Sequence, residues 1–204
     1  MASMDFVDGY FEAMDEVNRT LSREDVRRAV DLLYQTWEGD GTVYMMGNGG
    51  SASTATHFAS DLAKYTALPG KRRFRALSLG DNIPLVSALT NDSGFESIFV
   101  EQLRPCLKTG DLVVGLSVHG GSGTGDIGPW SQNLVQAVAL AKERGARTIG
   151  FSGFGGGALK DLTDVCIVVP WDSEPLGTLL VESYHVALHH LICGALKQRI
   201  ANNK

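Results

Sequence analysis

The sequence has no long hydrophobic run and no leader-like start. No stretch of its 204 residues approaches the roughly 20 consecutive apolar residues that a membrane span needs. The opening segment MASMDFVDGY is acidic and lacks the basic region and apolar run of a secretory signal. We therefore expect a cytoplasmic protein with no membrane partner.

The sequence also lacks blocks of like charge, and its cysteines are too few and too scattered to form a disulfide framework. The chain has 18 basic and 23 acidic residues, a net charge of −5, and neither sign is concentrated in one segment. This excludes the basic footprint of a nucleic-acid-binding protein, so we expect no nucleic-acid partner. The three cysteines, Cys106, Cys166 and Cys193, are odd in number and far apart. We predict that all three are reduced and buried.

The length and the 44% hydrophobic content are those of a chain that buries one sizeable core. We predict a single domain over residues 1–204. Apolar residues recur at helical spacing from Asp5 to Trp37, with a break near Thr20, where Ser22 is suited to cap a second helix. Residues 1–38 are therefore expected to form a helical segment that packs on the domain or on a neighbouring subunit.

Short apolar runs then alternate with helical patterns. This alternation indicates an α/β fold, a three-layer α/β/α sandwich with helices on both faces of a central parallel five-stranded sheet. The segment Ser117 to Ser131 is longer than an ordinary loop, so we expect it to be functional or mobile. The predicted strands are Thr42 to Met46, Arg75 to Ser78, Leu112 to Leu116, Thr148 to Phe151 and Val165 to Val169.

A glycine- and serine-rich turn follows the first predicted strand. This first turn, Gly47 to Ser53, reads GNGGSAS and leads into a helix. Its glycines let backbone amides approach an anion, its serines add hydroxyl donors, and the positive end of the helix dipole faces the same point. A plain tight turn has the same composition. The segment matches neither the P-loop nor the dinucleotide-binding pattern, so alone it leaves both interpretations open.

A second turn of the same kind, Ser117 to Ser122, follows the strand at Leu112 to Leu116. Turns at the carboxyl ends of strands that flank a switch point converge on one crevice, so together they indicate a single phosphate pocket. Neither turn carries Lys or Arg, which favours recognition by amides and hydroxyls. We expect a phosphorylated small molecule, most simply a sugar phosphate. The candidate binding residues here are Asn48, Gly49, Gly50, Ser51, Ser117, Val118, His119 and Ser122.

Two groups of acid-base side chains lie on predicted helices. His57 and Asp61 are four residues apart and so share a helix face, a spacing that suits a metal pair or a proton-transfer pair. For an isolated pair, a solvated Asp beside a core His is the simpler interpretation. The C-terminal helix, Leu179 to Ile200, adds a second and denser group, formed by Glu182, His185, His189 and His190.

Taken together, these segments resemble the phosphoheptose isomerases, within the wider sugar isomerase (SIS) fold. These enzymes interconvert sedoheptulose 7-phosphate and D-glycero-D-manno-heptose 7-phosphate. The resemblance covers nearly the whole chain and is most specific in its first and last blocks. It is carried by Gly47 to Leu62, Leu89 to Leu103, Gly110 to Ser122, Ala141 to Pro170 and Val181 to Ile192.

The resemblance implies a flavodoxin-like strand order, a homotetramer with active sites at subunit interfaces, and an aldose-ketose isomerase. Phosphate would be held by Ser51, Ser117 and Ser122, with Glu182 at the substrate. Asp61 would be the base and His190 its partner. Asn91 and Asp92 would reach sugar hydroxyls, although Asn-Asp is equally good turn chemistry. The resemblance also implies one zinc ion held by His57, Asp61, Glu182 and His190.

Glu182 and His190 are separated by eight residues, or about 12 Å along a straight helix. This is too far for both to bind one ion through bonds of about 2 Å. The implied zinc site therefore requires a bend near Glu182 or a side chain from a neighbouring subunit.

Several positions depart from the family pattern. Asp61 replaces the usual Glu, Glu182 the usual Gln, and Tyr65 an Arg; Val118 and His119 stand where Thr and Ser are usual. The loop before Asn133 carries an insertion with Asp126, Pro129 and Trp130. These changes fit the same reaction on another phosphosugar, or a partner subunit in a pathway of modified heptoses. A non-catalytic sugar-phosphate-binding module is the alternative from another functional class.

Overall fold

The five strands and the helices that connect them follow the predicted alternation. The computed structural model describes residues 5–121 and 130–203. The strands are β1 Thr42–Gly47, β2 Arg75–Ser78, β3 Leu112–Leu116, β4 Arg147–Ser152 and β5 Val165–Val168. The helices are α1 Phe6–Thr20, α2 Arg23–Glu38, α3 Gly50–Lys64, α4 Ile83–Ser93, α5 Ile98–Leu103, α6 Gln132–Glu143, α7 Gly157–Leu162 and α8 Gly177–Asn202, with a 3-10 turn η1 at Phe95–Ser97.

The sheet is parallel throughout and has the strand order β2-β1-β3-β4-β5, which confirms the predicted flavodoxin-like order. Strands β1 and β3 are neighbours, in a register that places Gly47 opposite Leu116. The order reverses between these two strands, so their carboxyl ends flank the switch point, where ligands bind in this class of sheet.

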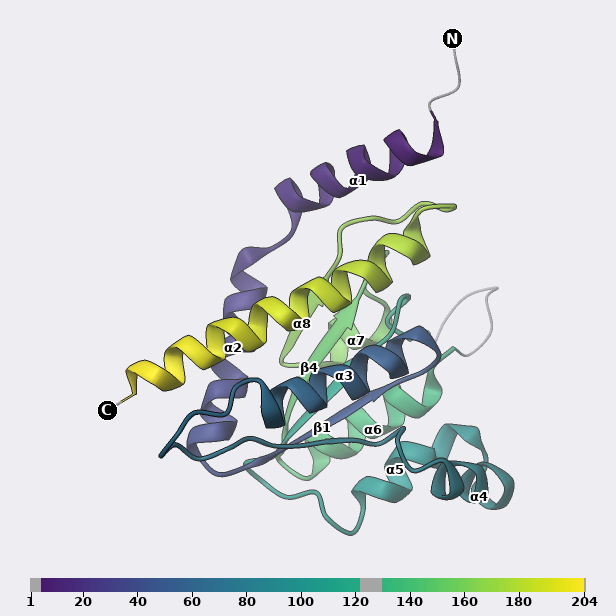
Figure 1. The fold of residues 1–204 in the computed structure, drawn as a ribbon. Coiled ribbons are helices and arrows are strands. Elements are labelled where there is room, and N and C mark those ends of the chain that lie inside the picture. Colours follow the sequence, from purple (N-terminus) through teal and green to yellow (C-terminus); the bar gives the residue numbers. More distant parts are fainter. Residues whose placement is uncertain (1–4, 122–129, 204) are drawn as a thin grey trace.

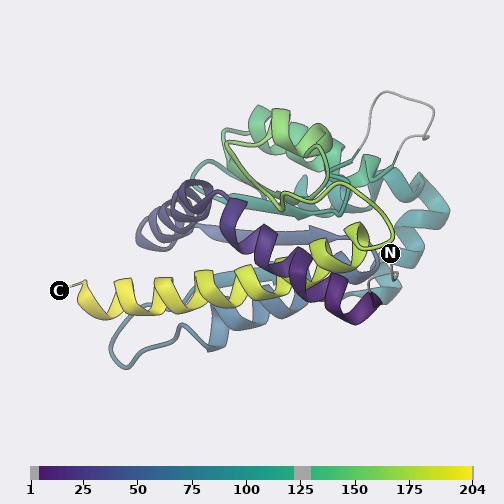
Figure 2. The same cartoon turned by 90° about the horizontal axis from the view of Figure 1, so that it is seen from above.

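Helices cover both faces of the sheet, as Figure 2 shows from above. Side chains alternate along β1: Val43 and Met45 join the core beneath α2, α3 and α8, whereas Tyr44 and Met46 join the core beneath α5, α6 and α7. This period of two is what a strand buried on both faces requires. The predicted three-layer sandwich is therefore confirmed.

The N-terminal helices are joined at the predicted break. Ser22 Oγ accepts a hydrogen bond from Asp25 N at 3.2 Å and caps α2. Helix α1 lies along the start of α8 (Figure 1), where the Tyr184 hydroxyl donates to Met14 O at 2.7 Å and Tyr10 hydrogen-bonds Ser183 at 3.0 Å. Helix α1 thus contacts α8 of its own chain; packing of this segment on a neighbouring subunit stays a prediction.

Helix α8 is the central element on its face of the sheet. By length and composition it is the one helix among the described residues that is long and apolar enough to cross a membrane. Half of its apolar window is buried in the protein, and it packs against α2 and α3. Its apolar content is therefore accounted for by its position as a core helix, and the cytoplasmic location stays a prediction.

The prediction that all three cysteines are buried is wrong for Cys106. Cys193 is buried on α8 and Cys166 is partly buried on β5, but Cys106 is exposed. It lies in the connection between α5 and β3, at the surface, where its thiol points back to Gln102 O at 3.2 Å. All three are free thiols.

His185 on α8 gives the fold a predicted pH dependence. Its side chain is fully buried, with Nε2 at 3.3 Å from the carbonyl oxygen of Ser152. Burial lowers the pKa of His185 from 6.5 to about 4, against a smaller opposing effect of that hydrogen bond. Below pH 6.5 the unfolded chain therefore binds a proton that the folded chain does not, so stability falls as the pH falls.

We expect His185→Gln to reduce this loss, because the Gln amide can donate to Ser152 O without titrating. Between pH 7 and pH 5 the free energy of unfolding should fall by about 2 kcal/mol less in the variant than in the parent protein. Urea unfolding at both pH values measures the difference, with circular dichroism at pH 7 confirming the fold of the variant. Equal losses in the two proteins would contradict the expected role of His185.

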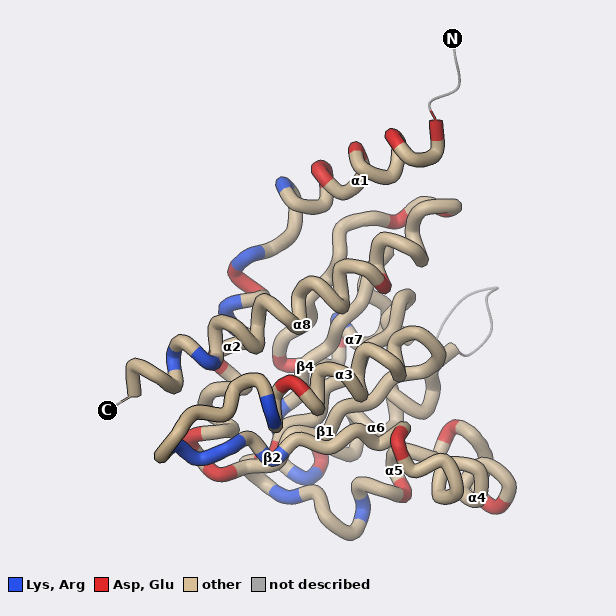
Figure 3. The backbone as a smooth tube through the Cα atoms, in the orientation of Figure 1, with Lys and Arg blue, Asp and Glu red and all other residues tan. Residues whose placement is uncertain are grey.

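Charged residues are unevenly placed along the backbone, as Figure 3 shows. Acidic residues occur along α1, and basic residues gather near the start of β2, where Arg72 and Arg75 pair with Asp40 at 3.7 and 3.2 Å. The start of β2 is at the amino ends of the parallel strands. It is thus far from the two turns at their carboxyl ends.

Candidate functional site

The first turn connects β1 to α3 through positions that only glycine fits. Gly49 has φ of +55°, a left-handed conformation that residues with a Cβ rarely adopt. A Cβ on Gly47 would lie 2.5 Å from the carbonyl oxygen of Ser51 in the first turn of α3. The strand end and the helix start are therefore in direct backbone contact. Ser51, at this helix start, is almost fully buried.

The second turn leaves β3 beside the first. Ser117 N donates to Phe151 O on β4 at 3.0 Å, and Ser117 Oγ lies 3.3 Å from Ser131 Oγ at the start of α6. A Cβ on Gly120 would meet the carbonyl oxygen of Gly156 at 1.9 Å. The backbone of the second turn thus packs directly on the loop that precedes α7. Ser122 lies outside the described residues.

The two turns line one cavity of about 170 Å³, here called the turn cavity. Because β1 and β3 are adjacent strands, the two turns lie side by side, as predicted for turns on either side of the switch point. Its polar groups are amides, hydroxyls, one imidazole and one carboxylate. The lining residues are Asn48, Ser51, Leu116, Ser117, Val118, His119, Trp130, Ser131 and Glu182.

A pair of side-chain amides holds the first turn to α6. Asn48 and Asn133 exchange two hydrogen bonds, Nδ2 to Oδ1 in each direction, at 3.0 and 2.9 Å. Asn133 is buried, and it also accepts from the backbone N–H of Leu134. Asn48 is among the site residues that the sequence predicts, whereas Asn133 and Ser131 are not. The signal for both was a Ser and an Asn at the point where the long loop becomes a helix.

Aromatic rings border the second turn. The His119 ring lies 4.2 Å from the Phe154 ring and 5.0 Å from the Trp130 ring, measured between centroids. Trp130 lines the turn cavity although much of its side chain is exposed. His119 is therefore packed against two aromatic side chains at the border of the turn cavity.

Glu182 reaches the turn cavity from α8. Its carboxylate lies against the first residue of α3, because a Cβ on Gly50 would be 2.4 Å from Glu182 Oε1. Gly50 thus leaves the room that this carboxylate occupies. The helix N-terminus beside it favours the negative charge.

A second constellation lies farther along α3 and α8. His57, Asp61, His189 and His190, here called the histidine cluster, place one ligand atom each within 4.8 Å of one another and form a group that can hold a metal ion. Asp61 Oδ2 lies 3.5 Å from His57 Nε2, 3.3 Å from His189 Nε2 and 3.6 Å from His190 Nε2. Within one chain, the structure thus joins three of the expected zinc ligands to His189.

His189 is the buried member of the cluster. Its ring stacks on Phe58 at 5.3 Å, and among the described residues neither of its ring nitrogens has a hydrogen-bond partner. Burial, then the nearby His190 and His57, lower its pKa to about 4, against a smaller effect of Asp61. The ring is therefore neutral near pH 7, the form in which imidazole binds a metal. The sequence places His189 in the C-terminal group of acid-base side chains, but the resemblance does not imply it as a ligand.

Two expected substrate residues lie elsewhere in the chain. Asn91 and Asp92 are exposed in the last turn of α4, where the Asn91 amide donates to the Asp92 carboxylate at 2.8 Å. Neither lines the turn cavity. Their approach to a sugar stays a prediction, which within this fold requires a neighbouring subunit or a movement of α4.

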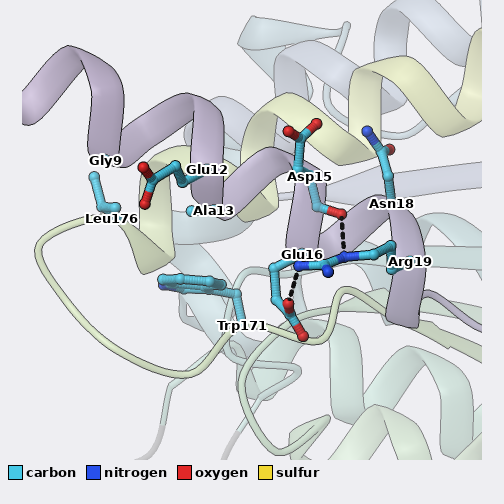
Figure 4. A pocket seen from close by; sticks show the side chains of 9 residues that line it. All are labelled: Gly9, Glu12, Ala13, Asp15, Glu16, Asn18, Arg19, Trp171 and Leu176. Carbon is cyan, nitrogen blue, oxygen red and sulfur yellow. Dashed lines mark hydrogen bonds and ion pairs between the residues drawn. The ribbon is translucent and has the colours of Figure 1, made fainter.

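A larger cavity of about 930 Å³ lies between α1 and the segment before α8 (Figure 4). Three acidic side chains of α1 line it, and its one cation, Arg19, is bonded to Glu16 at 2.5 Å and to the Asp15 carbonyl oxygen at 3.4 Å. Trp171 and Leu176 form the opposite wall. Three carboxylates disfavour a phosphate here, whereas the turn cavity has one carboxylate, Glu182, together with hydroxyls and a helix N-terminus, so the turn cavity is the better candidate for an anion.

Comparisons with known proteins agree with this geometry. The sequence profile of the SIS domain matches residues 5–153. A phosphoheptose isomerase of Geobacter sulfurreducens is 32% identical over 200 residues, which are 97% of this chain and 98% of that protein. The solved structure of a phosphoheptose isomerase from Neisseria gonorrhoeae superposes with a TM-score of 0.79 at 27% identity, covering 94% of this chain and 95% of the other.

A further relative is more similar in sequence but longer. The lincomycin biosynthesis protein LmbN of Streptomyces lincolnensis is 52% identical over 164 residues, or 80% of this chain. The matched part is 58% of that relative's length, so the chain spans little more than half of it.

Proposed function

The chain belongs to the phosphoheptose isomerases, a SIS-domain family of phosphosugar isomerases, and we propose that it interconverts sedoheptulose 7-phosphate and D-glycero-D-manno-heptose 7-phosphate. One observation carries this proposal: two hydroxyl-lined turns share a cavity at the start of α3, and the same helix carries acid-base side chains farther along. The proposed active unit is a single domain assembled as a homotetramer.

The phosphate is proposed to bind in the turn cavity. Ser51 and Ser117 offer buried hydroxyls there, and Gly49 and Gly50 open the N-terminus of α3 to an anion. The Asn48–Asn133 amide pair fixes the first turn, which keeps its backbone N–H groups in place before the ligand arrives.

The spacing of the two constellations suits a long sugar chain. Helices α3 and α8 run side by side in the same direction, with Glu182 beside Gly50 and His190 beside Asp61. From Glu182 to His189 the helix rises by about 10 Å. A seven-carbon chain spans roughly 10 Å from its terminal phosphate to C1, given bonds of about 1.5 Å. A phosphate in the turn cavity thus lets C1 and C2 reach the histidine cluster.

The proposed chemistry is proton transfer between neighbouring carbons. From ketose to aldose, a base removes a proton from C1, a proton is returned to C2, O2 gains a proton and O1 loses one. Asp61 is assigned either the carbon proton or a bond to zinc, because a carboxylate bound to zinc is a poorer base, and His190 is assigned the oxygen protons; the two side chains lie 3.6 Å apart. When bound by the histidine cluster, zinc supplies a Lewis acid that polarises a carbonyl oxygen. His57, Asp61 and His190 belong both to this cluster and to the ligand set that the resemblance implies.

A coupled assay tests the proposed function. Metal-free and zinc-loaded protein are each incubated with sedoheptulose 7-phosphate, and the aldose product is followed over time. We expect turnover that depends on zinc. Absence of the aldose with both forms of the protein, while the ketose phosphate still binds, would contradict the proposed substrate.

A second candidate is the same reaction on a different phosphosugar, in the making of a small-molecule antibiotic. The 52% identity to a lincomycin biosynthesis protein supports it. His119, which stands where the family pattern has Ser, and Trp130, which lies in the insertion, both line the turn cavity and support a different sugar. A kcat/KM at least tenfold higher for another ketose phosphate than for sedoheptulose 7-phosphate would favour this candidate.

A further inference from the structure

We propose that His189 completes a zinc site within a single subunit of this chain. The inference rests on the proposed function for the presence of a metal and changes which side chains hold it. His189 takes the place that the resemblance gave to Glu182. The four ligand atoms are Nε2 of His57, Nε2 of His189, Nε2 of His190 and Oδ2 of Asp61.

The distances from Asp61 to the three imidazoles suit zinc coordination. Zinc binds imidazole nitrogen at 2.0–2.1 Å and carboxylate oxygen at 2.0–2.2 Å, so two ligand atoms at a tetrahedral angle lie about 3.4 Å apart. From Asp61 Oδ2, the three imidazole Nε2 atoms lie at 3.3, 3.5 and 3.6 Å. The ligand atoms of the four residues all lie within 4.8 Å of one another, so small side-chain movements bring them around one ion.

The ring nitrogens of His189 are poorly satisfied within the protein. Its side chain is fully buried, Nδ1 has no hydrogen-bond partner among the described residues, and Nε2 lies 3.3 Å from the Asp61 carboxylate without the alignment of a hydrogen bond. A buried polar group without a partner costs about 1–3 kcal/mol. The position packs on Phe58, so an apolar side chain would fill it without that cost. A metal bond to Nε2 satisfies the ring and accounts for a histidine at this position.

Glu182 is placed for a different task. It lies two helical turns before His189, about 10 Å by helix rise, and α8 is continuous from Gly177 to Asn202. Its carboxylate rests against Gly50 and lines the turn cavity with Ser51. Within one subunit it therefore does not reach the ion and stays available to the sugar.

Measured zinc affinities distinguish the ligand set that contains His189 from the set that contains Glu182. A chromogenic chelator competes for zinc with the parent protein, with His189→Leu and with the matched variant Glu182→Leu. We expect His189→Leu to weaken zinc binding by at least about 100-fold, since loss of a direct ligand costs more than the 10- to 100-fold of an outer partner. Glu182→Leu, which removes every possible ligand atom at that position, should stay within about twofold. If Leu disturbs the packing on Phe58, His189→Ala carries the same expectation.

Cobalt gives a second readout that does not depend on catalysis. Co²⁺ bound by the parent protein should show the visible absorption of a tetrahedral site, and this spectrum should be lost in His189→Leu and kept in Glu182→Leu. Zinc loss in Glu182→Leu, alone or together with His189→Leu, would overturn the inference. A parent protein that binds no zinc would overturn it as well, whereas isomerase turnover by that metal-free protein would leave the proposed function standing.

Discussion

Replacing Asp61 with Asn is expected to lower kcat by at least about 10³-fold. The Asp61 carboxylate is the common neighbour of three imidazoles, with Oδ2 within 3.6 Å of each Nε2. An amide keeps the shape of the side chain but neither takes up a proton nor binds zinc as a carboxylate does. The turn cavity lies at the other end of α3, so phosphate binding should change by no more than about twofold.

The measurement is kcat together with the Kd of a phosphorylated sugar alcohol that cannot isomerise. Asp40→Asn is the matched control. Asp40 is exposed near the start of β2, where it pairs with Arg75, and its φ of +59° is one that Asn tolerates. Turnover in Asp61→Asn close to that of Asp40→Asn would overturn the role assigned to Asp61.

Gly47→Ala is expected to destabilise the fold and the phosphate site together. The added Cβ would lie 2.5 Å from Ser51 O and 2.9 Å from Ala52 N, so the start of α3 must move. Forced overpacking of this kind costs about 3 kcal/mol. At about 2–4 °C per kcal/mol for a chain of this size, Tm should fall by roughly 6–12 °C. The displaced N–H groups should weaken phosphate binding by about tenfold.

Gly155→Ala is the control, because a Cβ there meets no atom within 4 Å and its φ is not positive. Thermal unfolding and calorimetry with a non-isomerisable sugar phosphate measure both effects. A Tm for Gly47→Ala equal to that of Gly155→Ala would show that β1 and α3 are not in the close contact described. A lower Tm with unchanged phosphate affinity would show that the first turn does not bind the phosphate.

The sheet and the turn cavity were predictable because local signals were strong there. Each strand coincides with a short apolar run, and the ends agree to within one residue at β1, β4 and β5. The alternation of strands and helices allows few topologies, and the parallel order brings the ends of β1 and β3 together. Hydroxyls at both turns then predicted one pocket, which the structure contains.

Contacts between distant segments were not predictable in the same way. Asn133 lies 85 residues from Asn48, and no periodicity relates the two. Cys106 follows a proline between two elements, and its exposure depends on how that connection crosses the surface. His189 and His190 are neighbours on one helix, 100° apart, so spacing alone favours one of them as a ligand. Packing of α3 against α8 brings both to Asp61.

The central claim is that this chain moves a proton between adjacent carbons of a phosphosugar. Its most direct test is to incubate zinc-loaded protein with sedoheptulose 7-phosphate in D₂O and to follow the sugar by NMR. We predict an aldose product that carries deuterium at C2, because the carbon proton exchanges with solvent while the base holds it. A sugar that stays a ketose, with no deuterium at C1 after prolonged incubation, would contradict the account.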